Sequence, residues 1–252
     1  MATPPTFVST TATAVNTTTS PKTTASIAVV NGDVLVAWAV AENDQIPSPY
    51  TIDVTTASGS TSAWTQRVAH STAVAGGPGD ICYRRGLTAT ATATGNITVT
   101  FTRTTGSTAP AMGGYVKVWR GSAGVGNANV GTNNVAANSA PTIAVTASAN
   151  SGLDFFDADW NASSGTVTFT ATSGSLVTDV SNQTGAGSTY CIFSSHVVDC
   201  GTAGSKSMGM SAPALQRWVC GVIEILGSGA VAAKGIPLFG MRRKFFTRRI
   251  NR

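Results

Sequence analysis

The 252 residues include 16 basic and 11 acidic side chains, and only 11% are charged while 42% are hydrophobic. A typical globular chain is about 25% charged, so this polar surface must be built from Thr, Ser, Asn and Gly, which suit strands and tight turns better than long solvated helices. The longest apolar stretch, from Val34 to Ala41, is far shorter than the roughly 20 residues of a transmembrane helix, so we expect no membrane span.

Short apolar runs alternate with turn residues through the first half of the chain. The turn signal Asn31-Gly32-Asp33 precedes a nearly continuous apolar run, 34–41, which predicts a strand buried on both faces. In the segment 96–103, Ile97, Val99 and Phe101 alternate with threonines, which is the period of a half-buried strand. The strands expected in this half are 26–30, 34–41, 64–73, 81–93, 96–103 and 115–119.

The second half continues in the same way. We expect strands at 142–146, 153–160, 166–170, 190–198 and 218–226. Roughly a dozen short strands without a helical period predict a single β-sandwich or jelly roll. No repeat of fixed period is visible, so residues 1–226 are expected to form one domain, followed by a flexible linker at 227–233.

Four cysteines, Cys82, Cys191, Cys200 and Cys220, do not have the spacing of a zinc site. Cys191 and Cys200 could pair across a hairpin. The alternative, which we favour, is that all four are reduced thiols in or near a β-core. The N-terminus has neither the basic nor the apolar region of a secretory signal, so we expect the chain to be made and kept in a cytoplasm.

One acidic cluster has residue types that could hold a cation. Asp154, Asp157, Asp159 and Asn161 offer oxygen ligands of the kind that Ca²⁺ takes. In a strand, however, Asp157 and Asp159 would share one face and Asp154 would take the other. A polar strand face therefore explains these residues better than a metal site, and we expect no metal or other cofactor.

A hydrolase would need a nucleophile and a base. Ser194, Ser195, His196 and Asp199 are of the right types, and His70 is the other histidine, but no nucleophile elbow surrounds the serines. Gly76–Gly79 lacks the Lys-Ser/Thr of a phosphate loop. We therefore expect no enzymatic activity.

Tryptophans could form a sugar-stacking platform, because jelly rolls include lectin domains. Most of the five lie within apolar strands, where core packing is the simpler interpretation. Trp64, between Ala63 and Thr65, fits the core interpretation least well. The five are Trp38, Trp64, Trp119, Trp160 and Trp218.

Basic residues are concentrated after residue 233, which separates an arm, 234–252, from the body, and we expect this arm to be extended or to form a short helix. The arm holds seven basic and no acidic residues, so the body has nine basic against 11 acidic residues and a net charge of −2. This asymmetry indicates an arm with an acidic partner, which is a neighbouring subunit or, alternatively, the slightly acidic body of the same chain. We predict that it anchors the body through basic, aromatic and aliphatic side chains: Leu238, Phe239, Met241, Arg242, Arg243, Phe245, Phe246, Arg248, Arg249 and Ile250.

A series of segments in one order resembles the jelly-roll structural proteins of tailed phages that infect actinobacteria, often described as minor tail proteins. The segments are Gly32–Ala37, Trp64-Thr65, Tyr83–Arg85, Ile97–Phe101, Gly114–Trp119, Ala140–Thr142, Gly152–Asp154 and Arg217–Ile225. The resemblance covers nearly the whole body and includes no catalytic motif. It implies a virion component, assembled in the host cytoplasm, that contacts other tail or capsid subunits. We expect it to be a homo-oligomer or to be present in many copies in the particle.

We therefore expect a non-enzymatic virion protein, displayed on the particle and attached through residues 234–252. A capsid-surface decoration protein is one alternative, and a module that binds a host-surface glycan is another. A nucleic-acid binder is disfavoured, because the body is acidic and has no base-reading element.

Overall fold

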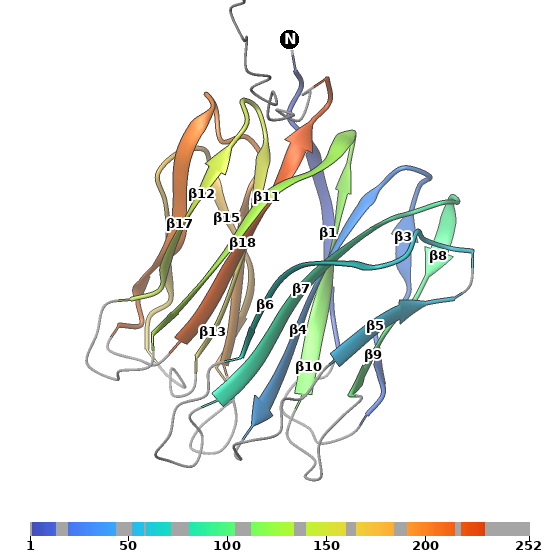
Figure 1. The fold of residues 1–252 in the computed structure, drawn as a ribbon, viewed down its shortest axis with the longest axis horizontal. Coiled ribbons are helices and arrows are strands. Elements are labelled where there is room, and N and C mark those ends of the chain that lie inside the picture. The colour runs from blue at the N-terminus through green and yellow to red at the C-terminus, as the bar shows by residue number, and fades with distance from the viewer. Residues whose placement is uncertain are drawn as a thin grey trace, which may run out of the picture.

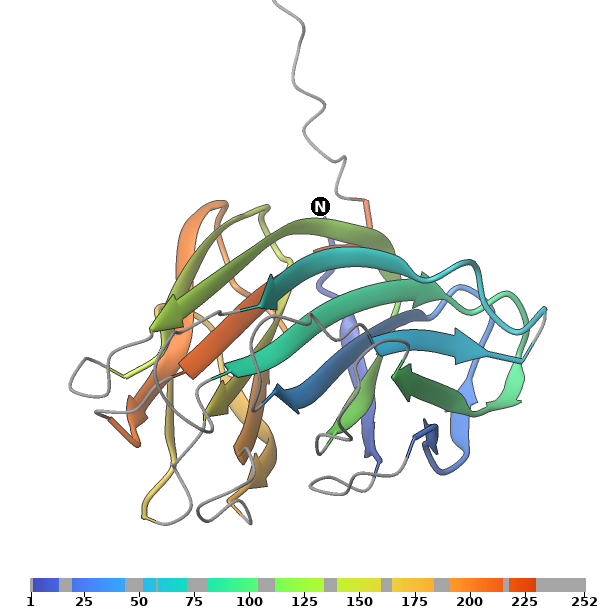
Figure 2. The same cartoon turned by 60° about the horizontal axis from the view of Figure 1, so that its bottom comes forward.

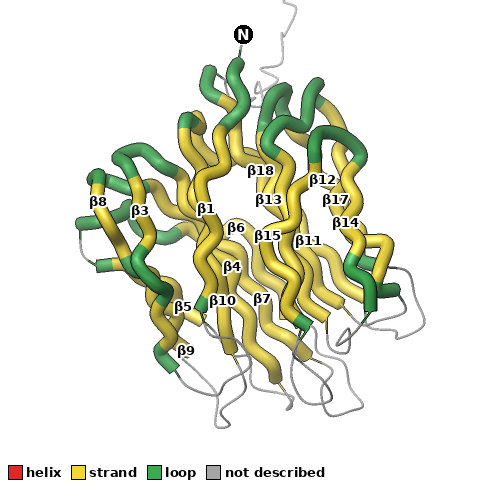
Figure 3. The backbone as a smooth tube through the Cα atoms, turned by 180° about the vertical axis from the view of Figure 1, so that it is seen from behind, coloured by secondary structure: helices red, strands yellow, loops and turns green. Residues whose placement is uncertain are grey.

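The computed structural model describes residues 2–13, 20–43, 52–57, 59–71, 81–103, 112–133, 140–159, 165–183, 191–214 and 218–229. These residues form 18 strands and no helix, so the all-β prediction is confirmed (Figure 3). No helix long and apolar enough to cross a membrane occurs in this part of the chain. The predicted arm, 234–252, lies outside the described residues.

Strands of the first half form one large and two small antiparallel sheets (Figure 1). The large sheet has the order β1-β10-β4-β7-β6, and the small sheets have the orders β2-β9-β5 and β3-β8. The strands are β1 (Thr6–Ala12), β2 (Lys22–Thr23), β3 (Ile27–Val29), β4 (Val34–Asn43), β5 (Ile52–Thr56), β6 (Thr65–Ser71), β7 (Ile81–Thr90), β8 (Gly95–Ile97), β9 (Val99–Arg103) and β10 (Met112–Arg120).

Strands of the second half form one large and one small antiparallel sheet. The large sheet has the order β11-β18-β13-β16-β15, and the small one has the order β12-β17-β14. The strands are β11 (Ser122–Asn133), β12 (Thr142–Ala147), β13 (Gly152–Asp159), β14 (Thr168–Ala171), β15 (Leu176–Asn182), β16 (Cys191–Val197), β17 (Gly204–Ala212) and β18 (Trp218–Gly227).

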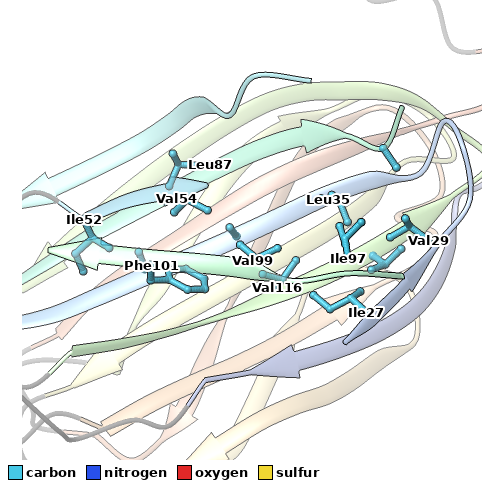
Figure 4. Close-up of a cluster of buried hydrophobic side chains, with 14 of the residues drawn as sticks. Ile27, Val29, Leu35, Ile52, Val54, Leu87, Ile97, Val99, Phe101 and Val116 are labelled. Atoms are coloured by element: carbon cyan, nitrogen blue, oxygen red, sulfur yellow. The ribbon is translucent and has the colours of Figure 1, made fainter. Parts of the chain in front are cut away.

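The sheets stack in layers (Figures 1 and 2). Three hydrophobic cores lie between neighbouring layers. The first core fills the space between the small sheets and the large sheet of the first half, and includes Leu35, Val99 and Phe101 (Figure 4). The second core joins the two large sheets, and the third lies between the sheets of the second half. Because successive side chains of a strand point to opposite faces, each large sheet contributes to two cores.

This layering explains the apolar runs. Every residue from Val34 to Val40 is buried, as predicted for a strand covered on both faces. The expected alternation at 96–103 is also confirmed, with Ile97, Val99 and Phe101 buried, although the segment is divided into β8 and β9.

The two halves repeat one strand order. In the first half, β2 with β3 and β8 with β9 are each one interrupted strand, since they pair consecutively along the same direction. With these joined, each half has eight strands, numbered 1 to 8 in chain order. The large sheet of each half then reads 1-8-3-6-5 and the small sheet 2-7-4. This structural repeat has no counterpart of fixed period in the sequence, and the prediction of one domain over residues 1–226 stays a prediction.

The register of the halves also agrees. A bulge separates Gln66 from Val68 in β6, and a bulge separates Thr178 from Val180 in β15, the corresponding strand. Aligning these bulges makes Arg67 equivalent to Asp179, and it makes Gly86, which pairs with Val68, equivalent to Ser194, which pairs with Val180.

The alignment extends to the central strands. Gly86 pairs with Trp38, and Ser194 pairs with Phe156, so these two aromatic residues are equivalent. Their rings stack on each other across the second core, with centroids 5.1 Å apart and planes 9° from parallel. Equivalent residues thus meet at the interface, as they do at a twofold axis.

Candidate functional site

The chain leaves the described body beside its N-terminal segment. Thr3 and Ser228 exchange two backbone hydrogen bonds, of 3.1 and 2.8 Å, and the Asn150 side-chain amide donates to the Ala2 oxygen at 3.0 Å. A Cβ atom on Gly227 would collide with the backbone oxygens of Asn150 and Thr3, so the close approach requires glycine there. The root of the predicted arm is therefore fixed at one end of the body, next to the start of β1 (Figure 1).

A buried charged network crosses the second core. Lys117 of β10 lies 3.0 Å from Oδ1 of Asp154 in β13 and 2.7 Å from Oδ2 of Asp179 in β15. His196 Nδ1 lies 2.7 Å from the other oxygen of Asp179. These four side chains are at most 3% exposed, so the network joins the halves and is closed to solutes.

Aromatic residues enclose this network. The indole nitrogens of Trp38 and Trp119 donate to the two oxygens of Asp154 at 2.8 and 3.0 Å. Phe7 of β1 stacks on the His196 ring with centroids 3.8 Å apart. The carboxylate of Asp154 thus has donors from two strands of the other half, which satisfies a charge that burial alone would destabilise.

The environment separates the pKa values of the two aspartates. Burial raises the pKa of Asp154, and Lys117 and the indole donors offset this only in part. Burial also acts on Asp179, but the hydrogen bond from His196 and the charge of Lys117 outweigh it and lower the pKa of Asp179. Asp179 is therefore the more strongly held anion of the pair.

The structure does not assemble the serine, histidine and aspartate considered above into a triad. His196 binds Asp179 and not Asp199, whose carboxylate accepts from the Gly201 backbone nitrogen at 2.8 Å. Ser194 donates to the Phe155 backbone oxygen at 2.7 Å. Sequence reasoning misses Asp179, because it predicts no strand at 176–182, and it places Lys117 only within an alternating strand at 115–119.

The acidic residues of β13 do not come together at one site either. Asp154 points into the second core, whereas Asp157 lies on the opposite face with Phe155, next to the Cys220 thiol. The two faces are as predicted, but the expectation of a polar strand face is wrong, since both carboxylates are at most 1% exposed. Side chains of Asp159 and Asn161 lie outside the described set. Among the described residues, no group of three His, Cys, Asp or Glu could hold a metal ion.

The cysteines whose side chains the structure describes are buried and reduced, as we expected: Cys191, Cys200 and Cys220. Burial raises the pKa of the Cys220 thiol, and nearby Asp157 raises it further. Such a thiol stays protonated and behaves as a small apolar group. The Cys82 side chain is outside the described set.

Tryptophans differ in their environments. Trp38, Trp119 and Trp218 are core residues, as predicted, whereas Trp160 lies outside the described residues. Trp64 is only partly buried and packs against the first core from its edge. It also lines an open groove of about 290 Å³ together with residues of β5 and of the β5–β6 connection.

No protein-family model, curated protein or solved structure matches this chain.

Proposed function

We propose that this protein is a non-enzymatic structural component of a tailed-phage virion, of the minor tail type, and that residues 234–252 attach its body to a neighbouring subunit. The observation that supports the proposal best is the fixed chain exit at Gly229. The hydrogen bonds between Thr3 and Ser228 hold this exit at one end of the stacked sheets. A body held there would extend its far end away from the particle.

The composition of the arm supports a protein partner. Burying one Phe side chain contributes about 1.5–3 kcal/mol, and an exposed ion pair contributes about 0–1 kcal/mol. The arm has three phenylalanines, Phe239, Phe245 and Phe246, besides its seven basic residues. The phenylalanines are therefore expected to supply most of the affinity, and the arginines the orientation and association rate.

We also propose that each half is a jelly-roll unit. A jelly roll arranges eight strands in two sheets with Greek-key connections, in the orders 1-8-3-6 and 2-7-4-5. In each half the large sheet has the order 1-8-3-6-5 and the small sheet has the order 2-7-4. Each half therefore differs from a jelly roll only in its fifth strand, which belongs to the large sheet. Such units serve in capsids and lectins alike. A decoration protein on the capsid surface would use the same body and arm.

Deleting residues 230–252 tests the attachment. The truncated protein should stay folded, because the three cores lie within residues 2–229. It should also be lost from purified particles, as measured by quantitative mass spectrometry of the virion. Incorporation of the truncated protein at the wild-type level would refute the anchoring role.

A pair of double variants separates apolar from electrostatic attachment. Phe245→Ala with Phe246→Ala should reduce incorporation more than Arg248→Ala with Arg249→Ala, since the arm's affinity is assigned to its aromatic side chains. The opposite order, together with a steep loss of binding in salt, would indicate a polyanion as the partner.

A further inference from the structure

The groove beside Trp64 lies at the outer edge of the first half, away from the arm root and from the buried network. Its wall is formed by β5 and the connection that follows it, and it includes Thr55, Thr56, Thr61, Ser62 and Trp64. We propose that this groove binds neutral oligosaccharide, with the Trp64 ring as the stacking surface and the threonine and serine hydroxyls as hydrogen-bond partners.

The chemistry of the lining favours a sugar. A tryptophan face packs against the C–H face of a sugar ring, while hydroxyls both donate and accept hydrogen bonds, as the hydroxyls of a sugar do. Among the described residues of its wall, four carry a hydroxyl group and none is charged. An uncharged ligand is therefore expected, and acidic sugars or phosphates are not. Its volume of about 290 Å³ suits the end of a short oligosaccharide.

The second half shows that this connection is larger than the fold needs. Residues 57–64 join β5 to β6, whereas the equivalent connection from β14 to β15 has only the residues 172–175. The register that equates Arg67 with Asp179 also equates Trp64 with Leu176. Leu176 is likewise partly buried against the core of its half. A leucine side chain is thus large enough to cover this edge of the core. The indole of Trp64 is larger than this packing role needs.

Hydrogen bonds hold the groove in shape without using the indole. Ser62 N donates to Thr90 O at 2.8 Å, and Thr92 Oγ1 donates to Gly59 O at 2.7 Å. The Trp64 nitrogen has no hydrogen-bond acceptor among the described residues, in contrast to those of Trp38 and Trp119. The connection is therefore organised in advance, which lowers the entropic cost of binding.

Saccharide binding by the full-length protein tests the groove. The probes are neutral mono- to tetrasaccharides of glucose, galactose, mannose and arabinose, with a sialylated and a sulfated sugar as charged comparisons, followed by saturation-transfer NMR. We expect a neutral saccharide to bind with a Kd of about 1 mM or below. Absence of binding by every neutral saccharide at about 20 mM, or binding of the charged sugars alone, would overturn the proposal.

Trp64→Leu is the decisive variant, because leucine already occupies the equivalent position in the second half. We expect it to keep the wild-type unfolding transition and to weaken saccharide binding by about tenfold or more, since the stacking surface is lost. Thr55→Val, which removes an exposed hydroxyl in the groove, should weaken binding several-fold. Thr170→Val on β14, the corresponding edge strand, is the matched control and should bind normally. Equal binding by Trp64→Leu and wild type would place the sugar elsewhere and refute the assignment.

This inference does not depend on the virion role. Trp64→Leu is expected to enter particles normally, whereas deletion of residues 230–252 is expected to leave saccharide binding intact. Failure of either proposal therefore leaves the other unaffected.

Discussion

The two halves of the body share one strand order and register but fill equivalent positions with different chemistry. Lys117 in the first half is equivalent to Ile223 in the second, and Asp154 in the second is equivalent to Val36 in the first. Lys117 and Asp154 thus have apolar residues at the equivalent positions of the other half, whereas Asp179 is equivalent to Arg67 and His196 to Thr88. Because the two large sheets pack face to face, these residues meet only in one arrangement of the halves.

The difference teaches how a repeated unit can specify one interface. An apolar core tolerates several packings of similar volume, whereas a buried charge requires its partner at one place. In this body the hydrophobic contacts of the second core supply the burial. The network of Lys117, Asp154, Asp179 and His196 fixes which residues face each other.

Lys117→Met should have the largest effect on stability. The variant leaves Asp154 and Asp179 buried without their cation, so we expect the free energy of unfolding to fall by about 3–5 kcal/mol. Ile223→Met is the matched control at the equivalent position and should cost less than about 1.5 kcal/mol. Urea denaturation of both variants measures the difference. Equal losses would show that the network adds nothing to an ordinary apolar contact.

Gly86→Ser places at position 86 the residue type found at the equivalent position, Ser194, in the second half. Overpacking should then lower the free energy of unfolding by about 1–3 kcal/mol. A Cβ atom at Gly86 would lie 2.7 Å from Cζ3 of Trp38, whose ring is fixed by its hydrogen bond to Asp154. Phe156, the smaller equivalent of Trp38, leaves room for Ser194 in the second half.

The companion test combines Gly86→Ser with Trp38→Phe, which reproduces the pair found in the second half. Thermal unfolding should show the double variant to be less destabilised than the sum of the two single variants. Strictly additive losses would contradict the steric explanation.

Lys22→Met should act mainly on the pH dependence of stability. Burial lowers the pKa of Lys22 from 10.5 to about 8, while its amine donates to the Met112 oxygen at 2.6 Å. Between about pH 8 and 10.5 the unfolded chain then binds more protons than the folded one, so this lysine makes the free energy of unfolding rise with pH.

Removal of Lys22 should therefore abolish that rise. The difference in unfolding free energy between wild type and Lys22→Met is expected to grow from pH 8 to 10.5 in urea denaturation series. Parallel pH profiles of the two proteins would show that Lys22 titrates normally in the folded state.

Two of the predicted strands show their burial pattern directly in the sequence. The Val34–Ala41 run and the alternation of Ile97, Val99 and Phe101 have clear periods, and both are strands. Strands β11 and β17 were not expected, because SAGVGNANVGTN and GSKSMGMSA contain few β-branched residues. Their pairing with β18, β12 and β14 overrides weak local preference.

The repeat and the network could not be read from the chain for a related reason. Equivalent positions such as Trp38 and Phe156, or Thr88 and His196, keep the packing and not the residue type, so no period is visible. Asp179 occupies a bulge, which turns its side chain toward Lys117 by a local change in register. Only the pairing of strands far apart in sequence brings these groups together.

The hydrogen bonds between Thr3 and Ser228 have one more consequence. The passage from the first half to the second takes place through the single residue Gly121, between Arg120, which pairs with Thr6, and Ser122, which pairs with Gly227. Both ends of the body and the crossing between its halves therefore lie at the same pole. The two ends of the body thus lie beside the crossing between its halves. A permuted chain in which the second half precedes the first could therefore form the same arrangement in space. A cargo fused ahead of Ala2 would emerge at the root of the arm, and the opposite pole would stay free of it.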